Sequence, residues 1–86
     1  MPNIKIYTTT NCSYCTRAKS LLSRKGLVYE EIDVSVDFEE RSRLKVLTHG
    51  RRTLPQVFVG ETHVGGCDDL YALEAKGGLD ALLASA

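Results

Sequence analysis

Apolar residues follow two different spacings along the first part of the chain. Residues 4–7 alternate apolar and mixed positions, which is typical of a short β-strand. Over residues 14–25 the apolar side chains instead recur at helical spacing, at Cys15, Ala18, Leu21 and Leu22. Gly26 then stands where a left-handed C-terminal cap ends many helices. The pattern predicts a strand followed by an amphipathic helix.

A second strand and a second helix are expected between residues 28 and 50. Residues 28–34 alternate, with Val28, Ile32 and Val34 on one face and Tyr29, Glu31 and Asp33 on the other. Asp37 and Glu40 have the spacing of a helix capping box, and the inward helix face is expected from Phe38, Leu44 and Leu47. Because a helix between two strands normally returns the chain in the same direction, strands 4–7 and 28–34 are predicted to pair in parallel.

The rest of the chain is typical of a hairpin followed by helices. Residues 56–59 and 62–64 are strand-like runs, and Gly60 between them permits a tight turn. The carboxylates of Asp68 and Asp69 favour a helix start, and the inward residues of that helix are expected to be Leu70, Ala72 and Leu73. A last short helix is expected over residues 79–83. The predicted order is β-α-β-α-β-β-α, an α/β fold.

Length, composition and charge exclude several classes of protein. The chain of 86 residues suits one domain, residues 1–86, with 43% hydrophobic and 26% charged residues. Eleven basic residues balance eleven acidic ones, which argues against nucleic acid or an anionic membrane as a partner. No stretch reaches the ~18 apolar residues of a membrane span, and residues 1–10 lack the pattern of a signal peptide. A cytoplasmic protein is therefore expected.

The cysteines carry the candidate chemistry. Three cysteines, with two of them close together, make a poor disulfide scaffold and favour a catalytic or metal-binding pair. Cys12 lies where the first strand gives way to a helix, and the free amides and positive dipole end there stabilise a sulfur anion. The pKa of Cys12 is expected below the ~8.5 of a free thiol, which makes Cys12 the catalytic nucleophile. Cys15, one helical turn deeper, is placed to resolve the mixed disulfide.

Two features leave other interpretations open. His63 and Cys67 form a second pair of zinc-ligand residue types, which together with Cys12 and Cys15 makes a structural zinc module an alternative. The helical setting of the first pair and the long separation of the second argue against a zinc knuckle. Pro55, just before a strand, fits either a simple strand start or a tight turn with a functional role.

Three motifs, taken in order, resemble those of the glutaredoxin family. They are Y-T-x-x-x-C-x-Y-C at residues 7–15, T-L-P at residues 53–55 and G-G-C-D-D at residues 65–69, and the chain is most similar to short bacterial dithiol members. The resemblance implies a thioredoxin-like fold, with a four-stranded mixed sheet, helices on both faces and Pro55 in the cis form. It also implies glutathione-dependent reduction, with glutathione and disulfide-bonded or glutathionylated proteins as partners.

The resemblance further implies where glutathione binds. Tyr14 would border the groove, and the backbone of Leu54, between Thr53 and Pro55, would pair with the peptide part of glutathione. Its γ-glutamyl end would be received by Cys67, Asp68 and Asp69. Amides at a helix start suit the carboxylate of that end, and a neighbouring aspartate suits its ammonium group.

The carboxylate at the glycine end of glutathione needs a cation. Arg51 fits that role by its position just before Thr53. It also belongs to a basic cluster that could equally be a solvated helix face, formed by Arg41, Arg43, Lys45, Arg51 and Arg52.

Two positions depart from the common glutaredoxin pattern. Ser13 follows the first cysteine where many members have proline, and Thr9 stands where many have lysine, so weaker glutathione binding is expected. Some members with Cys-Ser-Tyr-Cys bind a [2Fe-2S] cluster between two subunits, through the first cysteine of each subunit and two glutathiones. The resemblance therefore adds a second hypothesis, in which Cys12 is a cluster ligand. A monomer is expected, and a dimer only with the cluster.

Overall fold

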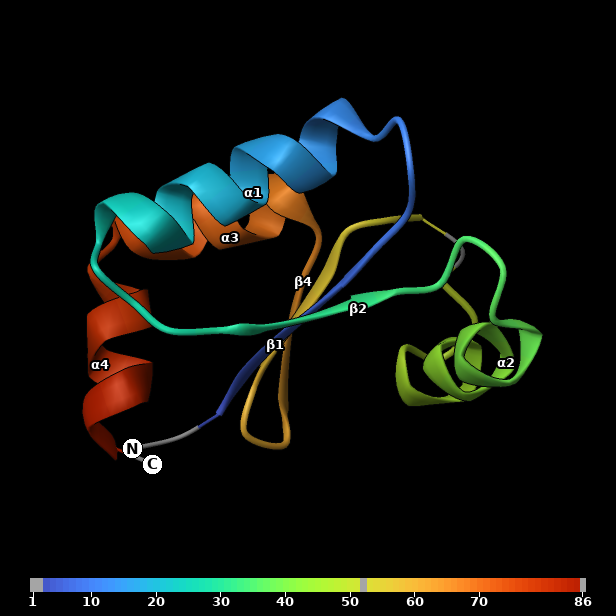
Figure 1. The fold of residues 1–86 in the computed structure, drawn as a ribbon. Helices are drawn as coiled ribbons and strands as arrows, with labels where there is room; N and C mark the ends of the chain where they lie inside the picture. Colours follow the sequence, from blue (N-terminus) through green and yellow to red (C-terminus); the bar gives the residue numbers. More distant parts are fainter. Residues whose placement is uncertain (1–2, 52, 86) are drawn as a thin grey trace.

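The computed structural model describes residues 3–51 and 53–85, and Arg52 of the basic cluster lies outside them. Its strands are β1 (Ile4–Thr8), β2 (Glu30–Asp33), β3 (Gln56–Val59) and β4 (Thr62–Gly65). Its helices are α1 (Ser13–Arg24), α2 (Phe38–Leu47), α3 (Cys67–Ala75) and α4 (Gly78–Ser85) (Figure 1). The predicted order of elements, with its last short helix, is confirmed.

The strands form one mixed sheet in the order β2-β1-β3-β4. β1 and β2 run parallel, with Tyr7 opposite Ile32, because α1 carries the chain back before β2 begins. β3 pairs antiparallel with both β1 and β4, and Gly60 turns the hairpin with a φ of +59°. The predicted parallel pair and hairpin are confirmed. Among the described residues, no helix is long and apolar enough to cross a lipid bilayer.

One face of the sheet is covered by α1, α3 and α4 (Figure 1). Strand alternation turns Ile4 and Ile6 of β1 and Val57 and Val59 of β3 toward these helices. They pack against buried helix residues, namely Ala18, Leu21, Leu22, Leu70 and Leu79. Each large aliphatic side chain that is fully buried contributes about 1.5–3 kcal/mol. This layer therefore holds α1 and α3 side by side on the sheet.

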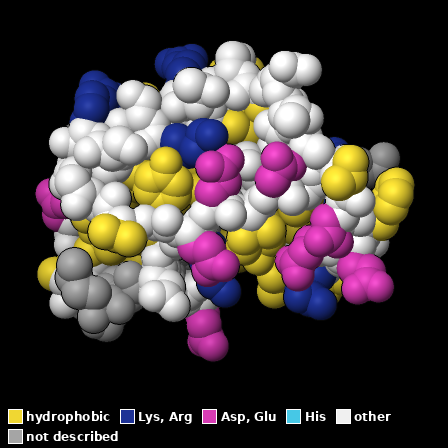
Figure 2. Space-filling view, in the orientation of Figure 1, with side chains coloured by type: hydrophobic (Ala, Val, Ile, Leu, Met, Phe, Trp, Pro, Cys, Tyr) yellow, Lys and Arg dark blue, Asp and Glu magenta, His cyan; other side chains and the backbone are white. Residues whose placement is uncertain are grey.

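The opposite face carries α2, so helices lie on both faces as predicted. A smaller core forms there from Tyr7, Val34, Leu44 and Phe58. The prediction that Phe38 and Leu47 point inward was wrong, because these side chains are 83% and 46% exposed. Thr48, one turn after Leu44, is buried with it, whereas Phe38 lies about 120° around the helix from Leu44. Uncovered hydrophobic side chains are visible over α2 in Figure 2.

The predicted start of the second strand and the predicted inward position of Ala72 were wrong. Val28 alternates in step with Ile32 and Val34, as expected, but it is 91% exposed because β2 begins only at Glu30 and no described element covers Val28. Ala72 of α3 is also exposed, whereas Leu70 is buried. Alternation in the sequence shows which face a residue takes, but not how far the opposite layer extends over that face.

Candidate active site

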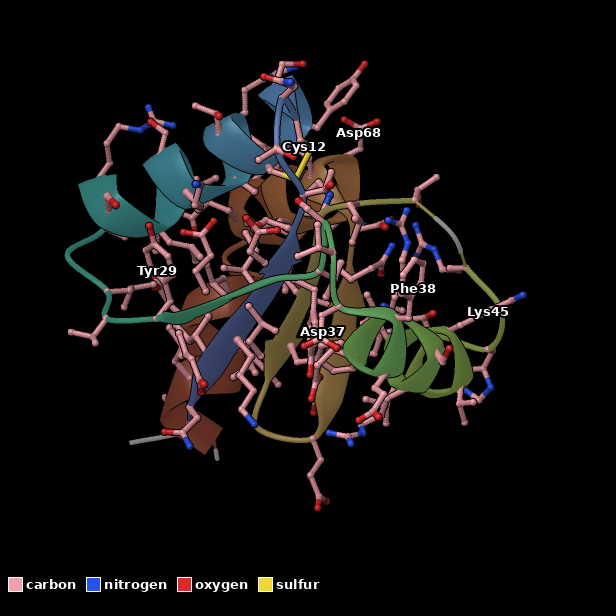
Figure 3. All side chains as sticks on the ribbon, turned by 45° about the vertical axis from the view of Figure 1, so that its right-hand side comes forward. Cys12, Tyr29, Asp37, Phe38, Lys45 and Asp68 are labelled. Atoms are coloured by element: carbon pink, nitrogen blue, oxygen red, sulfur yellow. A yellow bond between two sulfur atoms is a disulfide. The ribbon has the colours of Figure 1, made fainter. Side chains whose placement is uncertain are left out.

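Cys12 is the N-cap of α1, at the carboxyl end of β1. Its backbone is extended, with φ −111° and ψ 104°, and the Cys15 amide donates a hydrogen bond to Cys12 Sγ at 3.1 Å. Cys12 and Cys15 form a disulfide, with their Cα atoms 5.2 Å apart (Figure 3). The structure therefore presents the oxidised form, with the sulfur of Cys12 at the position where helix amides lack internal partners.

The two sulfur-bearing residues differ in access. Cys12 is half-buried, whereas Cys15 is only 1% exposed beneath the first turn of α1. An incoming sulfur compound therefore reaches Cys12, and Cys15 is available only to a sulfur already bound there. This difference agrees with the expected division into a nucleophilic and a resolving cysteine.

The loop that places Cys12 is tied to the start of the segment that leads into α2. The Ser35 hydroxyl lies 3.1 Å from Thr9 Oγ1 and accepts a hydrogen bond from the Thr10 amide at 2.8 Å. Asn11 then takes a left-handed backbone conformation, with φ +56°, immediately before Cys12. Thr9, which departs from the common family pattern, therefore anchors this loop and supplies no positive charge beside the sulfur.

A groove of about 250 Å³ lies between the start of α1, the segment before β3 and the start of α3. The structure brings all eight expected glutathione-binding residues to its walls, together with Gly66: Tyr14, Arg51, Thr53, Leu54, Pro55, Cys67, Asp68 and Asp69. The Leu54–Pro55 peptide bond is cis, as the resemblance implied. The carbonyl oxygen of Leu54 lies 3.8 Å from Cys12 Sγ, so the groove runs directly beside the reactive sulfur.

The start of α3 forms one end of this groove. Asp69 Oδ2 accepts a hydrogen bond from the Gly66 amide at 2.9 Å and lies 3.3 Å from Arg51 Nη2. The Gly66 hydrogen bond and, after it, Arg51 hold the pKa of the Asp69 carboxyl below its ordinary value. Asp69 is thus a charged helix cap at neutral pH, while Asp68 is exposed and lines the groove.

Cys67, the first residue of α3, is 4% exposed and keeps a free thiol. Burial raises the pKa of this thiol, and Arg17 only partly opposes that rise. Cys67 therefore lines the groove as a neutral group and is a poor nucleophile at neutral pH.

Gln56 is a residue of the site that sequence reasoning missed. Its buried side chain donates from Nε2 to the Thr53 carbonyl oxygen at 2.9 Å. Gln56 Oε1 therefore lies 2.6 Å from His63 Nε2. Because an amide oxygen can only accept, His63 Nε2 carries a hydrogen and donates it to Gln56 Oε1. The available signal was a glutamine at the start of an otherwise apolar strand, where a buried amide needs partners.

His63 is held by this hydrogen bond and by a stacked contact with Phe58 at 4.9 Å between ring centroids. Burial, and then the charge of Arg51, lower the pKa of His63. Among the described residues, no group of three or more histidine, cysteine or acidic side chains comes together as a metal site. The proposed zinc set of His63, Cys67 and the cysteine pair is therefore not assembled in this structure.

A family model described as glutaredoxin matches residues 4–64. The chain is 49% identical to glutaredoxin 3 of Escherichia coli over 83 residues, which is 96% of this chain and 99% of that protein. It is 54% identical to a glutaredoxin of Pseudomonas aeruginosa over 85 residues, which is 99% of this chain and all of that protein.

Solved structures extend the comparison to the fold. A solution structure of glutaredoxin from Brucella melitensis has 54% identity and a TM-score of 0.85, over 96% of this chain and 89% of that one. A buckwheat glutaredoxin–glutathione complex has 31% identity and a TM-score of 0.86, over 98% of this chain and 78% of that one. A structure concerned with metal binding of glutaredoxins has 53% identity and a TM-score of 0.73, over 96% of this chain and 89% of that one.

These matches cover both the sheet and the cysteine pair at the start of α1. The four-stranded mixed sheet with its flanking helices is the thioredoxin-like fold that the motifs implied. Thiol-disulfide exchange requires an accessible sulfur, and Cys12 supplies one at the start of α1, with Cys15 one turn further on. The chain belongs to the glutaredoxin family of thiol-disulfide oxidoreductases.

Proposed function

We propose that this protein uses glutathione to reduce glutathione mixed disulfides and protein disulfides. The observation that carries the proposal is the half-buried sulfur of Cys12 at a helix start, beside a groove of about 250 Å³. The groove offers the amides that begin α3, the carboxylate of Asp68 and the guanidinium of Arg51. These groups are complementary to a small peptide that carries two carboxylates and one ammonium group. The glutathione complex of the buckwheat relative supports the same class of ligand.

Reduction of a glutathionylated protein needs only Cys12. Its thiolate attacks the glutathione sulfur, a disulfide forms between Cys12 and glutathione, and the protein leaves as a thiolate that takes up a proton. The thiolate of a second glutathione then attacks the glutathione sulfur held by Cys12. Oxidised glutathione leaves and Cys12 returns as a thiolate. The Cys15 amide, 3.1 Å from Cys12 Sγ, stabilises the negative charge at that atom.

Reduction of a protein disulfide needs both cysteines. Cys12 attacks one sulfur of the substrate, and the other substrate sulfur leaves as a thiolate. Cys15 then attacks Cys12, which releases the second substrate thiol and leaves the Cys12–Cys15 disulfide seen here. Two glutathione molecules afterwards reduce that disulfide and leave as oxidised glutathione.

Glutathione is proposed to lie along the whole groove. The γ-glutamyl carboxylate is placed at the amides that begin α3, next to Cys67, and its ammonium group at Asp68. Leu54 supplies backbone pairing, while Tyr14, Thr53 and Pro55 shape the walls. Arg51 must turn from Asp69 to the glycine carboxylate. Exchange of this partly exposed ion pair costs little, since such pairs contribute about 0–1 kcal/mol.

Two serine variants test this division of roles. Cys12→Ser should abolish turnover of every disulfide substrate, because Cys15 and Cys67 are buried and cannot be reached by a substrate sulfur. Cys15→Ser should retain turnover of a glutathionylated peptide and lose reduction of a dithiol substrate. Both substrates are followed with glutathione and a coupled assay for its oxidised form. Equal loss of both activities in the Cys15 variant would contradict the proposal.

A [2Fe-2S] cluster is the second candidate function, favoured by Ser13 and by the metal-binding study of a similar glutaredoxin. The described cysteines of one chain do not suffice, because Cys15 and Cys67 are buried and only Cys12 presents an accessible sulfur. Cys12 would hold a cluster only with a second copy and glutathione, and the chain is otherwise proposed to be a monomer. A colourless monomer after anaerobic purification with glutathione would exclude this function.

Residues 1–86 are also proposed to form one domain that works in the cytoplasm. The unpaired thiol of Cys67 beside a disulfide that must open and close suits a reducing compartment, where stray disulfides are removed.

A further inference from the structure

A second groove, here called the α2 groove, adjoins the one beside Cys12. It has a volume of about 270 Å³ and shares Arg51, Thr53 and Leu54 with the glutathione groove. Its other wall comes from α2, through Phe38, Arg41, Leu44 and Lys45. The two grooves therefore meet at the segment before β3, so a chain that presents a sulfur to Cys12 lies within reach of the α2 groove.

The α2 groove concentrates positive charge in a chain whose net charge is zero. Arg41 and Lys45 are four residues apart, so they share one side of α2. Neither takes part in an ion pair within the described residues, whereas Arg43 of the same helix pairs with Glu40 at 2.7 Å. Like charges at this spacing cost a helix about 0.2–0.5 kcal/mol. Lys45 in the last turn suits the dipole of α2, but helix stability does not account for Arg41 one turn before it.

The groove also has apolar walls. Leu44 and Leu54 belong to the small core on this face of the sheet, and both line the groove. Phe38 at the start of α2 is 83% exposed, and Lys45 projects from the other end of the helix (Figure 3). A ligand that fits this surface has an apolar side chain for the walls and carboxylates for the two cations. Such a surface suits a polypeptide better than a nucleic acid.

We propose that the α2 groove receives an acidic segment of the protein substrate, adjacent to the cysteine that exchanges with Cys12. The proposal rests on the proposed function, because it names the class of protein whose disulfides the site reduces. Carboxylates of the segment pair with Arg41 and Lys45, and an apolar residue lies against Phe38. The glutathione moiety of the same substrate occupies the groove beside Cys12. Electrostatic attraction of this kind raises the rate of encounter and falls with ionic strength.

The kinetic test compares two glutathionylated peptides that differ only in their charged residues. One has Asp and Glu around a Phe near the cysteine, and the other has Lys at the same positions. The reference substrate is the mixed disulfide of glutathione with 2-mercaptoethanol, which is too small to reach α2. At low salt the wild-type protein should prefer the acidic peptide by about 3- to 10-fold in kcat/KM, as expected for two partly exposed ion pairs.

Charge reversal on α2 should remove that preference. The variant Arg41→Glu with Lys45→Glu should turn over both peptides alike or favour the basic one, and keep its activity on the small substrate. The matched control is Arg24→Glu with Lys76→Glu, which makes the same change of charge at the ends of α1 and α3. The control should keep the preference for the acidic peptide. Its loss in the control as well would overturn the proposal, since net charge would then be the cause.

A binding experiment with a peptide that cannot react separates this proposal from the proposed function. An acidic peptide with serine in place of its cysteine should shift the backbone NMR signals of residues 38–45, and the basic peptide should not. These shifts would support binding of an acidic segment in the α2 groove even if the protein failed to reduce the small substrate. That failure would refute only the proposed function. Absence of these shifts, equal slowing of all three substrates by the α2 variant, or stronger shifts with an oligonucleotide would overturn the inference.

Discussion

Gly65 connects β4 to the glutathione groove, and replacing it with alanine should be unusually costly. Its φ is +118°, a conformation that L side chains rarely adopt. A Cβ atom there would also overlap the Asp69 side chain, at 2.8 Å from Cγ and 2.9 Å from Cβ. Asp69 would have to turn away and give up its hydrogen bond with the Gly66 amide, 2.9 Å long in the native chain.

The expected loss is the sum of these two effects. Backbone strain at such a position costs about 1–3 kcal/mol, and a hydrogen bond to a partly exposed carboxylate contributes about 1 kcal/mol. Gly65→Ala should therefore lower the free energy of unfolding by about 2–4 kcal/mol. That is a large part of the roughly 5–15 kcal/mol that stabilises a typical protein. Urea unfolding followed by circular dichroism measures the difference.

A double-mutant cycle identifies Asp69 as the neighbour that must move. Asp69→Ala should cost about 1 kcal/mol in the native background and almost nothing after Gly65→Ala, because the cap is already lost. The control is Gly60→Ala, where φ is +59° and no atom lies within 4 Å of the added Cβ, so the Asp69→Ala cost should stay unchanged. Equal cost of Asp69→Ala in all three backgrounds would refute this reasoning.

Two further predictions concern the buried groups around the groove. Gln56→Leu keeps the size of the side chain but removes the hydrogen-bond partner of the Thr53 carbonyl oxygen and of His63 Nε2. The variant should lose about 1–3 kcal/mol of unfolding free energy, and its KM for glutathione should rise more than its kcat falls. An unchanged KM in steady-state assays would contradict this positioning role. Burial raises the pKa of Cys67, so its contribution to stability holds below the unfolded pKa of ~8.5 and is lost as pH rises through the folded pKa. Cys67→Ala should flatten this alkaline decline in urea unfolding, and iodoacetamide should modify Cys12 of the reduced protein well before Cys67; equal rates by mass spectrometry would be incompatible with a buried thiol.

Local patterns in the sequence were enough to predict the elements and the reactive sulfur. The helical spacing of Ala18 and Leu22 predicted α1, and the position of Cys12 just before it predicted an N-cap sulfur. The groove residues were different, because Leu54 and Asp68 are distant from Cys12 in the chain and only the sheet brings them close. No local pattern contains that information. The motifs shared with the glutaredoxin family supplied it.

The errors have a common physical origin in the amount of cover that each element receives. Phe38 is apolar but lies about 120° around α2 from Leu44, the residue through which α2 meets the sheet. Val28 alternates correctly, yet β2 begins only after it. The bond between Gln56 and His63 also depends on how β3 and β4 pair, with Phe58 opposite His63. Contacts across strands and the reach of a covering layer depend on three-dimensional packing, so single-sequence periodicity does not predict them.

The outer strand β2 has a consequence for how copies of this chain meet. A strand at the rim of a sheet leaves backbone groups unpaired and invites another strand to add there, which is a route to aggregation. β2 carries Glu30, Glu31 and Asp33 within its four residues, and Asp and Glu side chains are visible on this side of the molecule in Figure 2. Two copies that joined rim to rim would bring these carboxylates together. Mutual repulsion therefore disfavours a dimer in which the β2 strands of two copies pair with each other.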